Sequence, residues 1–199
     1  MGADMIPFIR NFSIDTEFFA PNDDSIIDEC VTTPGQHRLL RFDMISRNIG
    51  DADFLAGKPL EHPDRFVWSQ AHRHWHLKHF NEYKLLDSAG NEVVPGFKQG
   101  FCLEDFEQYD PQAGPQKFTC PMGQDRQIAG QHDQGVSPGW QDVYESQLPC
   151  QFVIIDGVPD GDYQMMANTN APRLIPEDDF TNNIVVVGLH IEGDTVTVR

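Results

Sequence analysis

Hydrophobic and polar residues alternate along most of this chain with the period of two that is typical of β-strands. Strand-like runs bounded by turn residues occupy 38–47, 82–86, 151–155, 163–168, 184–191 and 195–198. Few segments show the 3.6-residue period of a helix, and the sequences SAGNE, VPDGDY and IEGDT indicate turns of antiparallel hairpins. The pattern predicts a mainly β fold with an antiparallel β-sandwich core, long irregular loops and little helix.

The alternation is lost between residues 96 and 149, where Pro, Gly, Gln and Asp are frequent. A compact domain tolerates such a long irregular stretch mainly where the stretch is functional or covalently fixed. We therefore expect the chemistry of the protein to lie there.

The chain has 199 residues, which is enough for one core of ordinary size, and no linker-like change in composition divides it. We predict a single domain in which residues 1–37 form an N-terminal arm packed on a core of residues 38–199. The longest apolar run, 184–189, falls far short of the ~20 residues that span a bilayer, so no membrane partner is expected. The start MGADMIPF lacks a secretory signal pattern, which leaves export open.

The net charge adds a constraint on partners. The chain has 31 acidic and 14 basic residues, for a formal charge of −17. This charge repels phosphate backbones, which argues against nucleic acid, and it attracts cationic partners. Adaptation to high salt is an equally good explanation of the acidity, and the two explanations are compatible.

The strongest chemical signal is the segment HRHWH, which places histidines at His72, His74 and His76. Imidazole is the commonest side-chain ligand of transition metals. On a straight strand alternate rings share a face about 6.6 Å apart, but the outer pair starts about 13 Å apart. A three-histidine site therefore predicts a bent or bulged strand. The alternative is a part-buried strand whose histidines satisfy local hydrogen bonds, and no HExxH signature indicates a zinc protease.

The cysteines indicate the redox environment. Cys30, Cys102, Cys120 and Cys150 never occur as CxxC, which disfavours a thiolate metal site and a thioredoxin-like centre. Two disulfides and an oxidising compartment fit better.

Seven blocks in one order resemble the catalytic domain of the lysyl oxidases: LLRFDMISRNIGDADF, HRHWH, EYKLLD, FKQGFCLED, DQGVSPGWQDVY, CQFVIIDGVPDGDY and EDDFTNN. The similarity covers roughly residues 38–192. It implies a copper amine oxidase whose copper ligands are His72, His74 and His76. It also implies a lysine tyrosylquinone, a cofactor built from Lys98 and an oxidised Tyr144. Lys98 must lose its charge to add to the ring, and partial burial beside Phe97, Phe101 and the metal would lower its pKa.

The resemblance further implies the reaction. Primary amines, or lysine-containing cationic peptides and proteins, are oxidised by O₂ to aldehydes with release of hydrogen peroxide and ammonia. A base must remove a proton from the substrate, and we predict Asp142, which shares a strand face with Tyr144. A turn-capping role for Asp142 is an alternative, and His79 and His132 are other candidate bases.

The resemblance also implies the disulfide pairing. Members of the family usually carry ten cysteines, and the four present here match the pairs Cys30–Cys150 and Cys102–Cys120. Ala71 and Trp140 stand where the family has cysteines, and the expected partners of both are also missing. Cysteines lost in pairs are what disulfides predict and what metal ligation would not.

The oxygen-rich block EDDFTNN suits a hard cation such as calcium, although on composition alone an Asx-rich turn explains it as well. The resemblance implies a structural calcium site, with ligands listed in chain order as Asp4, the Met5 carbonyl, Glu177, Asp179, Asn182 and Asn183. Such a site would fix the N-terminal arm to the sandwich.

The chain departs from the family pattern at two positions near the site. Ser69 replaces a histidine in the stretch before the copper ligands, and Phe97 replaces the histidine before the cofactor lysine. The arm aligns poorly, and neither a scavenger-receptor module nor a basic propeptide precedes it. We therefore expect a minimal, microbial, secreted catalytic domain.

Two rival functions remain. A non-catalytic β-sandwich that binds copper or zinc would keep the histidines without a cross-link between Lys98 and Tyr144. A copper oxidase without a quinone would use O₂ and would not react with carbonyl reagents. Imidazole ligands alone do not distinguish copper from zinc.

Overall fold

The computed structural model describes residues 2–70, 72–96, 100 and 102–199. Strands dominate these residues, and the helices α1 (Asp24–Ile27) and α2 (Arg126–Ala129) are each about one turn long. The prediction of a mainly β fold with little helix is confirmed.

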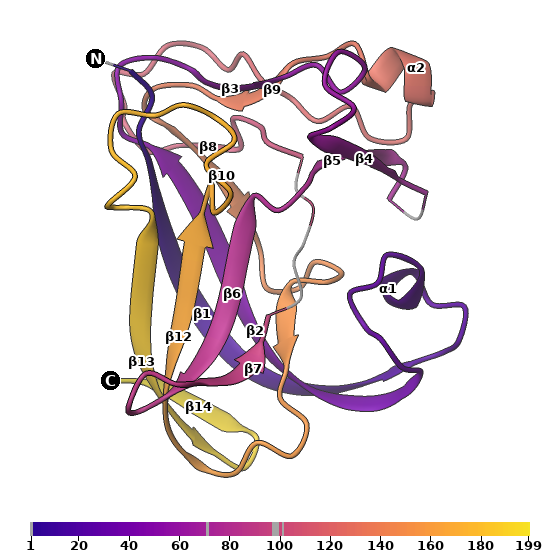
Figure 1. Cartoon of the computed structure of the whole chain (residues 1–199), viewed down its shortest axis with the longest axis vertical. Coiled ribbons are helices and arrows are strands. Elements are labelled where there is room, and N and C mark those ends of the chain that lie inside the picture. The colour runs from indigo at the N-terminus through magenta and orange to yellow at the C-terminus, as the bar shows by residue number, and fades with distance from the viewer. Residues whose placement is uncertain (1, 71, 97–99, 101) are drawn as a thin grey trace.

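One antiparallel sheet is built around a long central strand. In spatial order it contains β1 (Met5–Phe19), β2 (Gly35–Asn48), β10 (Trp140–Tyr144) and β8 (Glu107–Gln108), and β11 (Phe152–Ile154) also pairs with β2. Because β10 and β11 share β2 as a partner, the central strand holds two separate segments of the C-terminal half in place. Figure 1 shows β1 and β2 running together across the molecule.

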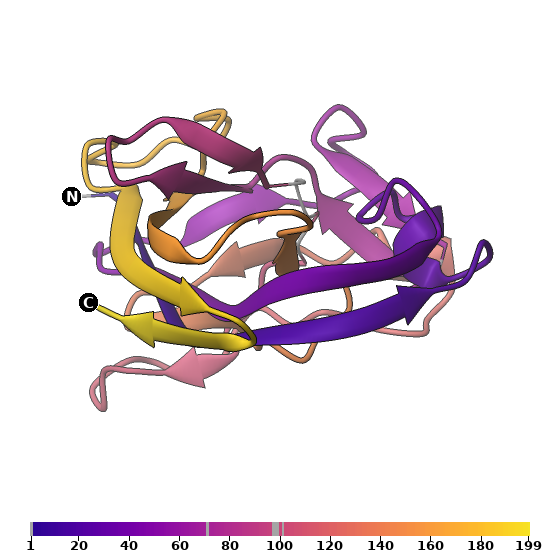
Figure 2. The same ribbon diagram turned by 90° about the horizontal axis from the view of Figure 1, so that it is seen from below.

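The second antiparallel sheet comes mostly from the C-terminal half. Its spatial order is β14 (Thr195–Val198), β13 (Ile184–Glu192), β12 (Gly161–Thr169), β6 (Asn81–Asp87) and β7 (Glu92–Pro95). Each of the six predicted runs overlaps a strand of one of these two sheets. The two sheets, viewed from below in Figure 2, form the main body of the molecule.

The core lies between the two sheets. Phe42 and Met44 of β2 belong to the same buried cluster as Tyr83 of β6 and Met165 of β12, and all four side chains are fully buried. The rings of Phe42 and Tyr83 meet edge to face at 4.9 Å, a favoured geometry for aromatic pairs. Burial of alternate residues from facing sheets is the packing of a β-sandwich, as the pattern predicted.

The alternation pattern missed β1, which pairs with β2 along most of its length. The register shifts between Arg10 and Ser13, where Asn11 has a φ of 56°. A bulge moves later side chains to the other face, so no period of two is sustained across this segment. The division of the chain at residue 37 stays a prediction.

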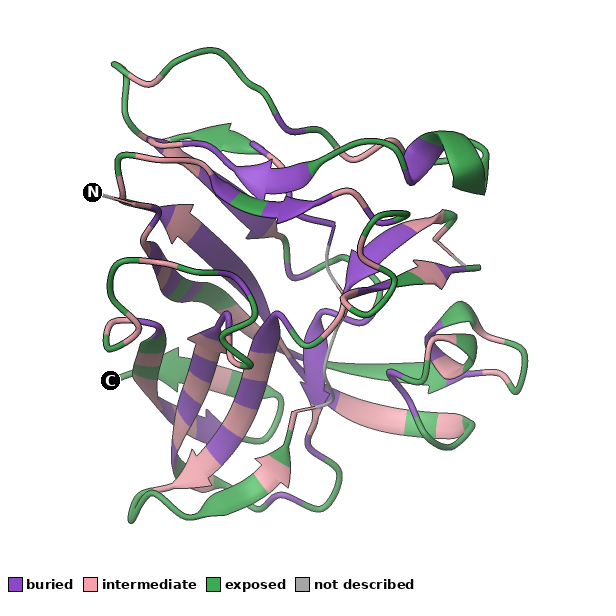
Figure 3. Ribbon diagram, turned by 45° about the horizontal axis from the view of Figure 1, so that its top comes forward, coloured by how far each residue is buried: buried purple, intermediate pink, exposed green. Residues whose placement is uncertain are grey.

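Two small two-stranded sheets cover one end of the sandwich. β3 (Phe54–Gly57) pairs with β9 (Gln134–Val136), and β4 (Phe66–Ser69) pairs with β5 (His74–Leu77). Most of β5 is buried, whereas α2 beside it is mostly exposed (Figure 3). No helix among the described residues has the length and apolar character needed to cross a membrane.

Candidate metal centre

The β4–β5 hairpin positions the three histidines. Ser69 of β4 faces His74 of β5 across the end of the hairpin, and His72 lies in the connecting turn. Arg73 adopts a φ of 54°, and this left-handed residue returns the chain toward β4. The prediction of one bent strand was therefore wrong in its detail: only His74 and His76 lie on a strand, and a turn places His72 beside them.

The donor nitrogens of the three rings converge. The Nε2 atoms of His74 and His76 are 2.9 Å apart, and the Nδ1 atom of His72 is 3.5 Å from Nε2 of His76. One nitrogen from each ring lies within 4.8 Å of the others. Two donor atoms about 2.0–2.1 Å from one ion are about 2.9 Å apart at a right angle and about 3.3 Å apart at a tetrahedral angle. These spacings fit three ligands of one transition-metal ion.

The surroundings of His74 favour neutral imidazole, the form that binds a metal. His76 is buried, while His72 and His74 are half-buried. Burial, together with the neighbouring His72, lowers the pKa of His74 to about 4. The Nδ1 atom of His74 is buried and has no hydrogen-bond partner among the described residues.

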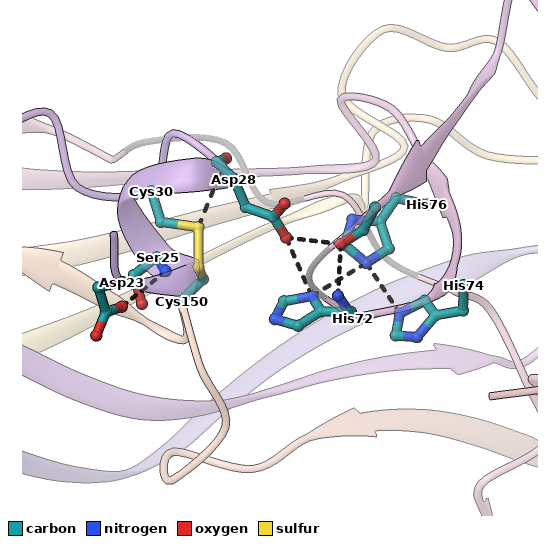
Figure 4. The surroundings of a disulfide bond; sticks show 9 residues. Asp23, Ser25, Asp28, Cys30, His72, His74, His76 and Cys150 are labelled. Carbon is teal, nitrogen blue, oxygen red and sulfur yellow. Dashed lines mark hydrogen bonds and ion pairs between the residues drawn. A yellow bond between two sulfur atoms is a disulfide. The ribbon is translucent and has the colours of Figure 1, made fainter. Parts of the chain in front are cut away.

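The Asp28 carboxylate contacts the triad (Figure 4), and the Ser69 hydroxyl bonds to that carboxylate. The Oδ2 atom of Asp28 is 3.3 Å from Nδ1 of His72, and the hydroxyl of Ser69 donates to the same oxygen at 2.8 Å. The amide of His72 donates to Oγ of Ser69 at 2.9 Å. The serine that replaces a family histidine thus joins Asp28 to the turn that carries His72.

The triad borders a cavity of about 350 Å³. From the long irregular stretch the cavity lining includes Cys102 and Glu104, and from β10 it includes Asp142 and Tyr144. Because β10 is hydrogen-bonded to the central strand β2, Asp142 and Tyr144 are held by the sandwich while the hairpin brings the histidines to the same space.

Asp142 and Tyr144 both titrate abnormally. Burial of Asp142, and to a smaller extent the charge of Glu104, raises the pKa of the carboxyl well above its ordinary value. Burial, with the charges of Asp142 and Glu104, raises the pKa of Tyr144. The Tyr144 hydroxyl donates to the Cys102 carbonyl at 2.6 Å. The raised pKa makes Asp142 able to take up and release a proton nearer neutral pH than an ordinary carboxylate does.

Lys98 lies outside the described residues, as do Phe97, Phe101 and Ala71. Gly100, two positions after Lys98 in the sequence, lines the cavity. A Cβ atom at Gly100 would come within 2.4 Å of Cβ of His76 and 2.9 Å of its ring, so only glycine fits against this histidine. The glycine of the FKQG block therefore allows close contact with the triad.

Both predicted disulfides are present. Cys30 is joined to Cys150, and Cys102 is joined to Cys120. Three of these cysteines, Cys102, Cys120 and Cys150, line the cavity. The Cys30–Cys150 bridge therefore connects the cavity wall to a segment distant in sequence, whereas the Cys102–Cys120 bridge closes a loop within that wall.

Of the two alternative bases, His132 is exposed and lines a different pocket, together with Asp53 and Lys117. His79 lies in the turn that follows β5 with a φ of 59°. Neither lines the cavity beside the triad among the described residues.

The predicted calcium ligands are brought together in part. Glu177 accepts from the Met5 amide at 2.8 Å and from the Asn183 side chain at 2.7 Å, while the side chain of Asn182 donates to Asp4 at 3.0 Å. The Oδ1 atoms of Asn182 and Asn183 are buried without a hydrogen-bond partner among the described residues, which fits a cation. Asp179 is exposed, and its carboxylate accepts from the amide and the hydroxyl of Thr181 at 2.7 Å.

Sequence reasoning gave no role to Asp28 or Glu104. Asp28 lies two residues before Cys30, and Cys150 lies six residues after Tyr144. The expected Cys30–Cys150 bridge therefore indicated that Asp28 lies near the site. Glu104 follows Cys102 in the FKQGFCLED block, and a single acidic residue there gives no sequence signal of its own.

The fold and the site together define a mainly β protein with a clustered histidine triad beside a half-buried tyrosine. A family model described as Lysyl oxidase matches residues 20–199. The chain belongs to the lysyl oxidase family.

Curated relatives agree with this assignment. Lysyl oxidase homolog 1 of Homo sapiens is 36% identical over 162 residues, covering 80% of this chain and 26% of that protein. Protein-lysine 6-oxidase of Sus scrofa is 37% identical over 161 residues, covering 79% of this chain and 59% of that protein. The human protein-lysine 6-oxidase is 35% identical over 161 residues, covering 79% of this chain and 35% of that protein. The matched region thus spans between about a quarter and three fifths of these relatives.

Proposed function

We propose that this protein is a secreted amine oxidase that depends on copper and on a lysine tyrosylquinone. It oxidises primary amines, including peptidyl lysine, to aldehydes, and it consumes O₂ and water and releases hydrogen peroxide and ammonia. The single observation that carries the proposal is the convergence of three imidazole nitrogens within 4.8 Å at the cavity that Tyr144 and Asp142 also line. Three nitrogen donors suit Cu²⁺.

The ligands in this proposal are His72, His74 and His76, and the cofactor residues are Lys98 and Tyr144. Bound copper and O₂ would oxidise the tyrosine ring, and the resulting quinone would supply the electron sink for amine oxidation. Tyr144 is held for this role by its hydrogen bond to the Cys102 carbonyl. Its raised pKa keeps the phenol protonated until a metal is near.

Asp142 is the proposed base. It would remove a proton from the substrate carbon that carries the amine and hold that proton on its buried carboxyl group. Its burial and the neighbouring Glu104 raise its pKa, which makes the carboxylate a stronger base than an exposed one. The apolar rim side chains Phe106, Met122 and Leu148 would limit the access of water to the reacting atoms.

The net charge of −17 supports cationic substrates, because it raises the local concentration of amines at low ionic strength. The two disulfides support secretion into an oxidising compartment. A structural calcium ion held by Asp4, Met5, Glu177, Asp179, Asn182 and Asn183 completes the proposal.

The test is peptide mapping by mass spectrometry after copper loading in air, with and without phenylhydrazine. The proposal expects a peptide containing Lys98 joined to one containing Tyr144, with added mass from the hydrazine. Lys98→Arg should abolish the joined species and amine oxidation, whereas Lys58→Arg, a control beside Glu61, should retain both. Separate peptides after full copper loading would favour the non-catalytic metal-binding function instead.

A further inference from the structure

Asp28 contacts the histidine triad from a part of the chain that precedes the seven family-like blocks. It caps the C-terminal end of α1, where its amide donates to the Asp24 carbonyl at 2.9 Å. The side chain is 14% exposed. A carboxylate this buried is costly unless it is paired, so its partners carry information about its role.

The partners of Asp28 lie at the metal centre. Its Oδ2 atom is 3.3 Å from Nδ1 of His72, the same nitrogen that is 3.5 Å from Nε2 of His76. A separation of about 3.3 Å is that of two donor atoms on one ion at a tetrahedral angle. Figure 4 shows the Asp28 carboxylate directed toward the His72 ring on the side that faces His76. The oxygen therefore lies at the edge of the triad, at ligand spacing from one of its three donor nitrogens.

The position of Asp28 is fixed by covalent and hydrogen-bonded links. Cys30, two residues later, is joined to Cys150, which lines the same cavity as the triad. Ser69 donates to the Oδ2 atom of Asp28 at 2.8 Å, and Ser69 is itself buried. Hydrogen bonds of this kind orient carboxylate ligands in metal sites.

We propose that Asp28 is a fourth ligand of the metal, and that the site is formed by three histidines and this carboxylate. The inference rests on the proposed function, because it takes the histidines to be metal ligands. Three imidazoles and one anionic oxygen form a donor set that suits Cu²⁺. The carboxylate would also neutralise one of the two positive charges of the ion, which strengthens binding in a half-buried site.

The test uses the metal-free protein titrated with Cu²⁺ against a competing chelator, together with electron paramagnetic resonance (EPR) of the copper-loaded forms. Asp28→Asn should weaken Cu²⁺ binding about 10-fold or more and shift the g∥ and A∥ values, because a neutral amide replaces an anionic oxygen. The matched control is Glu29→Gln, which removes the same charge from an exposed neighbouring side chain and should match the wild type in both readouts. Near-ultraviolet circular dichroism and non-reducing peptide mapping verify the fold and the Cys30–Cys150 bridge.

The outcomes distinguish the fourth-ligand assignment from the proposed function. An EPR spectrum of Asp28→Asn superposable on that of the wild type overturns the fourth-ligand assignment, even if affinity falls. A wild-type protein that binds no Cu²⁺ overturns the proposed function and this inference together. If Asp28→Asn fails to fold, Asp28→Glu decides, because moving the carboxylate by one methylene should alter the spectrum only if the carboxylate is bound to the metal.

Discussion

The hydroxyl of Tyr144 donates a 2.6 Å hydrogen bond to the carbonyl of Cys102, a residue bridged to Cys120. The proposed cofactor tyrosine on β10 is thus oriented by a disulfide-linked loop rather than by its own strand alone. The same loop carries Glu104, whose charge adds to the effect of burial in raising the pKa values of Asp142 and Tyr144. Loop geometry and the chemistry of the cavity are therefore linked.

Replacing Cys102 and Cys120 together with serine should lower the free energy of unfolding by about 3 kcal/mol, because a loop of this size regains its freedom in the unfolded chain. It should also lower the yield of phenylhydrazine-reactive protein, because Tyr144 loses a fixed partner. Urea unfolding and hydrazine titration measure the two effects. The comparison is the variant in which Cys30 and Cys150 are both replaced with serine. That bridge closes a longer loop, with a separation of 120 residues, so its removal should lower the free energy of unfolding by more. An unchanged quinone yield in the Cys102, Cys120 variant would show that the bridge does not orient Tyr144.

His74→Ala should abolish copper binding and quinone formation together, because the variant leaves two of the three clustered imidazoles. Metal analysis after dialysis and the absorbance of the quinone measure the two effects. His132→Ala removes an exposed histidine elsewhere and should behave as the wild type. Full quinone absorbance in His74→Ala would contradict the ligand assignment.

Asp142→Asn should lower kcat/KM for a primary amine about 10²- to 10⁴-fold, the usual contribution of a general base. The wild-type profile should rise with pH through the raised pKa of Asp142, because a protonated carboxyl cannot accept the substrate proton. The variant should lose that rise. The comparison is made on protein with equal hydrazine-reactive content, so that cofactor formation does not affect the result. A variant that keeps the wild-type rise would show that another group is the base.

Glu104→Gln should move the rise of kcat/KM with pH to lower pH. The negative charge of Glu104 favours the protonated form of Asp142, so its removal lowers the pKa of Asp142. The kcat/KM profile between about pH 5 and 9 measures the shift. Glu107→Gln, on an exposed residue of β8, is the control and should leave the profile in place. A shift to higher pH in Glu104→Gln would contradict the electrostatic argument.

Calcium should stabilise the protein and so raise its melting temperature. When free Ca²⁺ is one hundred times its Kd, the free energy of unfolding should rise by about 2.7 kcal/mol. Differential scanning calorimetry with Ca²⁺, Mg²⁺ and a chelator measures the effect. Glu177→Gln should remove the calcium effect, because it neutralises a half-buried carboxylate that contacts Asn183. Asp179→Asn tests the remaining ligand assignment, and a full calcium response in that variant would exclude Asp179 from the site.

The sequence was sufficient for the features that depend on local pattern. The period of two gave six of the strands in the two sheets, namely β2, β6, β11, β12, β13 and β14, because side chains on a strand that is buried on one face must alternate. HRHWH indicated a metal site, because three imidazoles within five residues can reach a common point. The order of the seven blocks indicated the family, which the match to residues 20–199 confirms.

Other features depended on residues far apart in the chain, and only the tertiary structure decided them. The strand β1 was hidden by a bulge at Asn11, and the turn at His72 depends on a left-handed Arg73 that no periodicity indicates. The contact of Asp28 with His72 joins positions 44 residues apart, and it exists because a disulfide and Ser69 fix both segments. A sequence determines which side chains are available locally, whereas the distances and the burial that set ligand geometry and pKa values arise only when distant segments pack together.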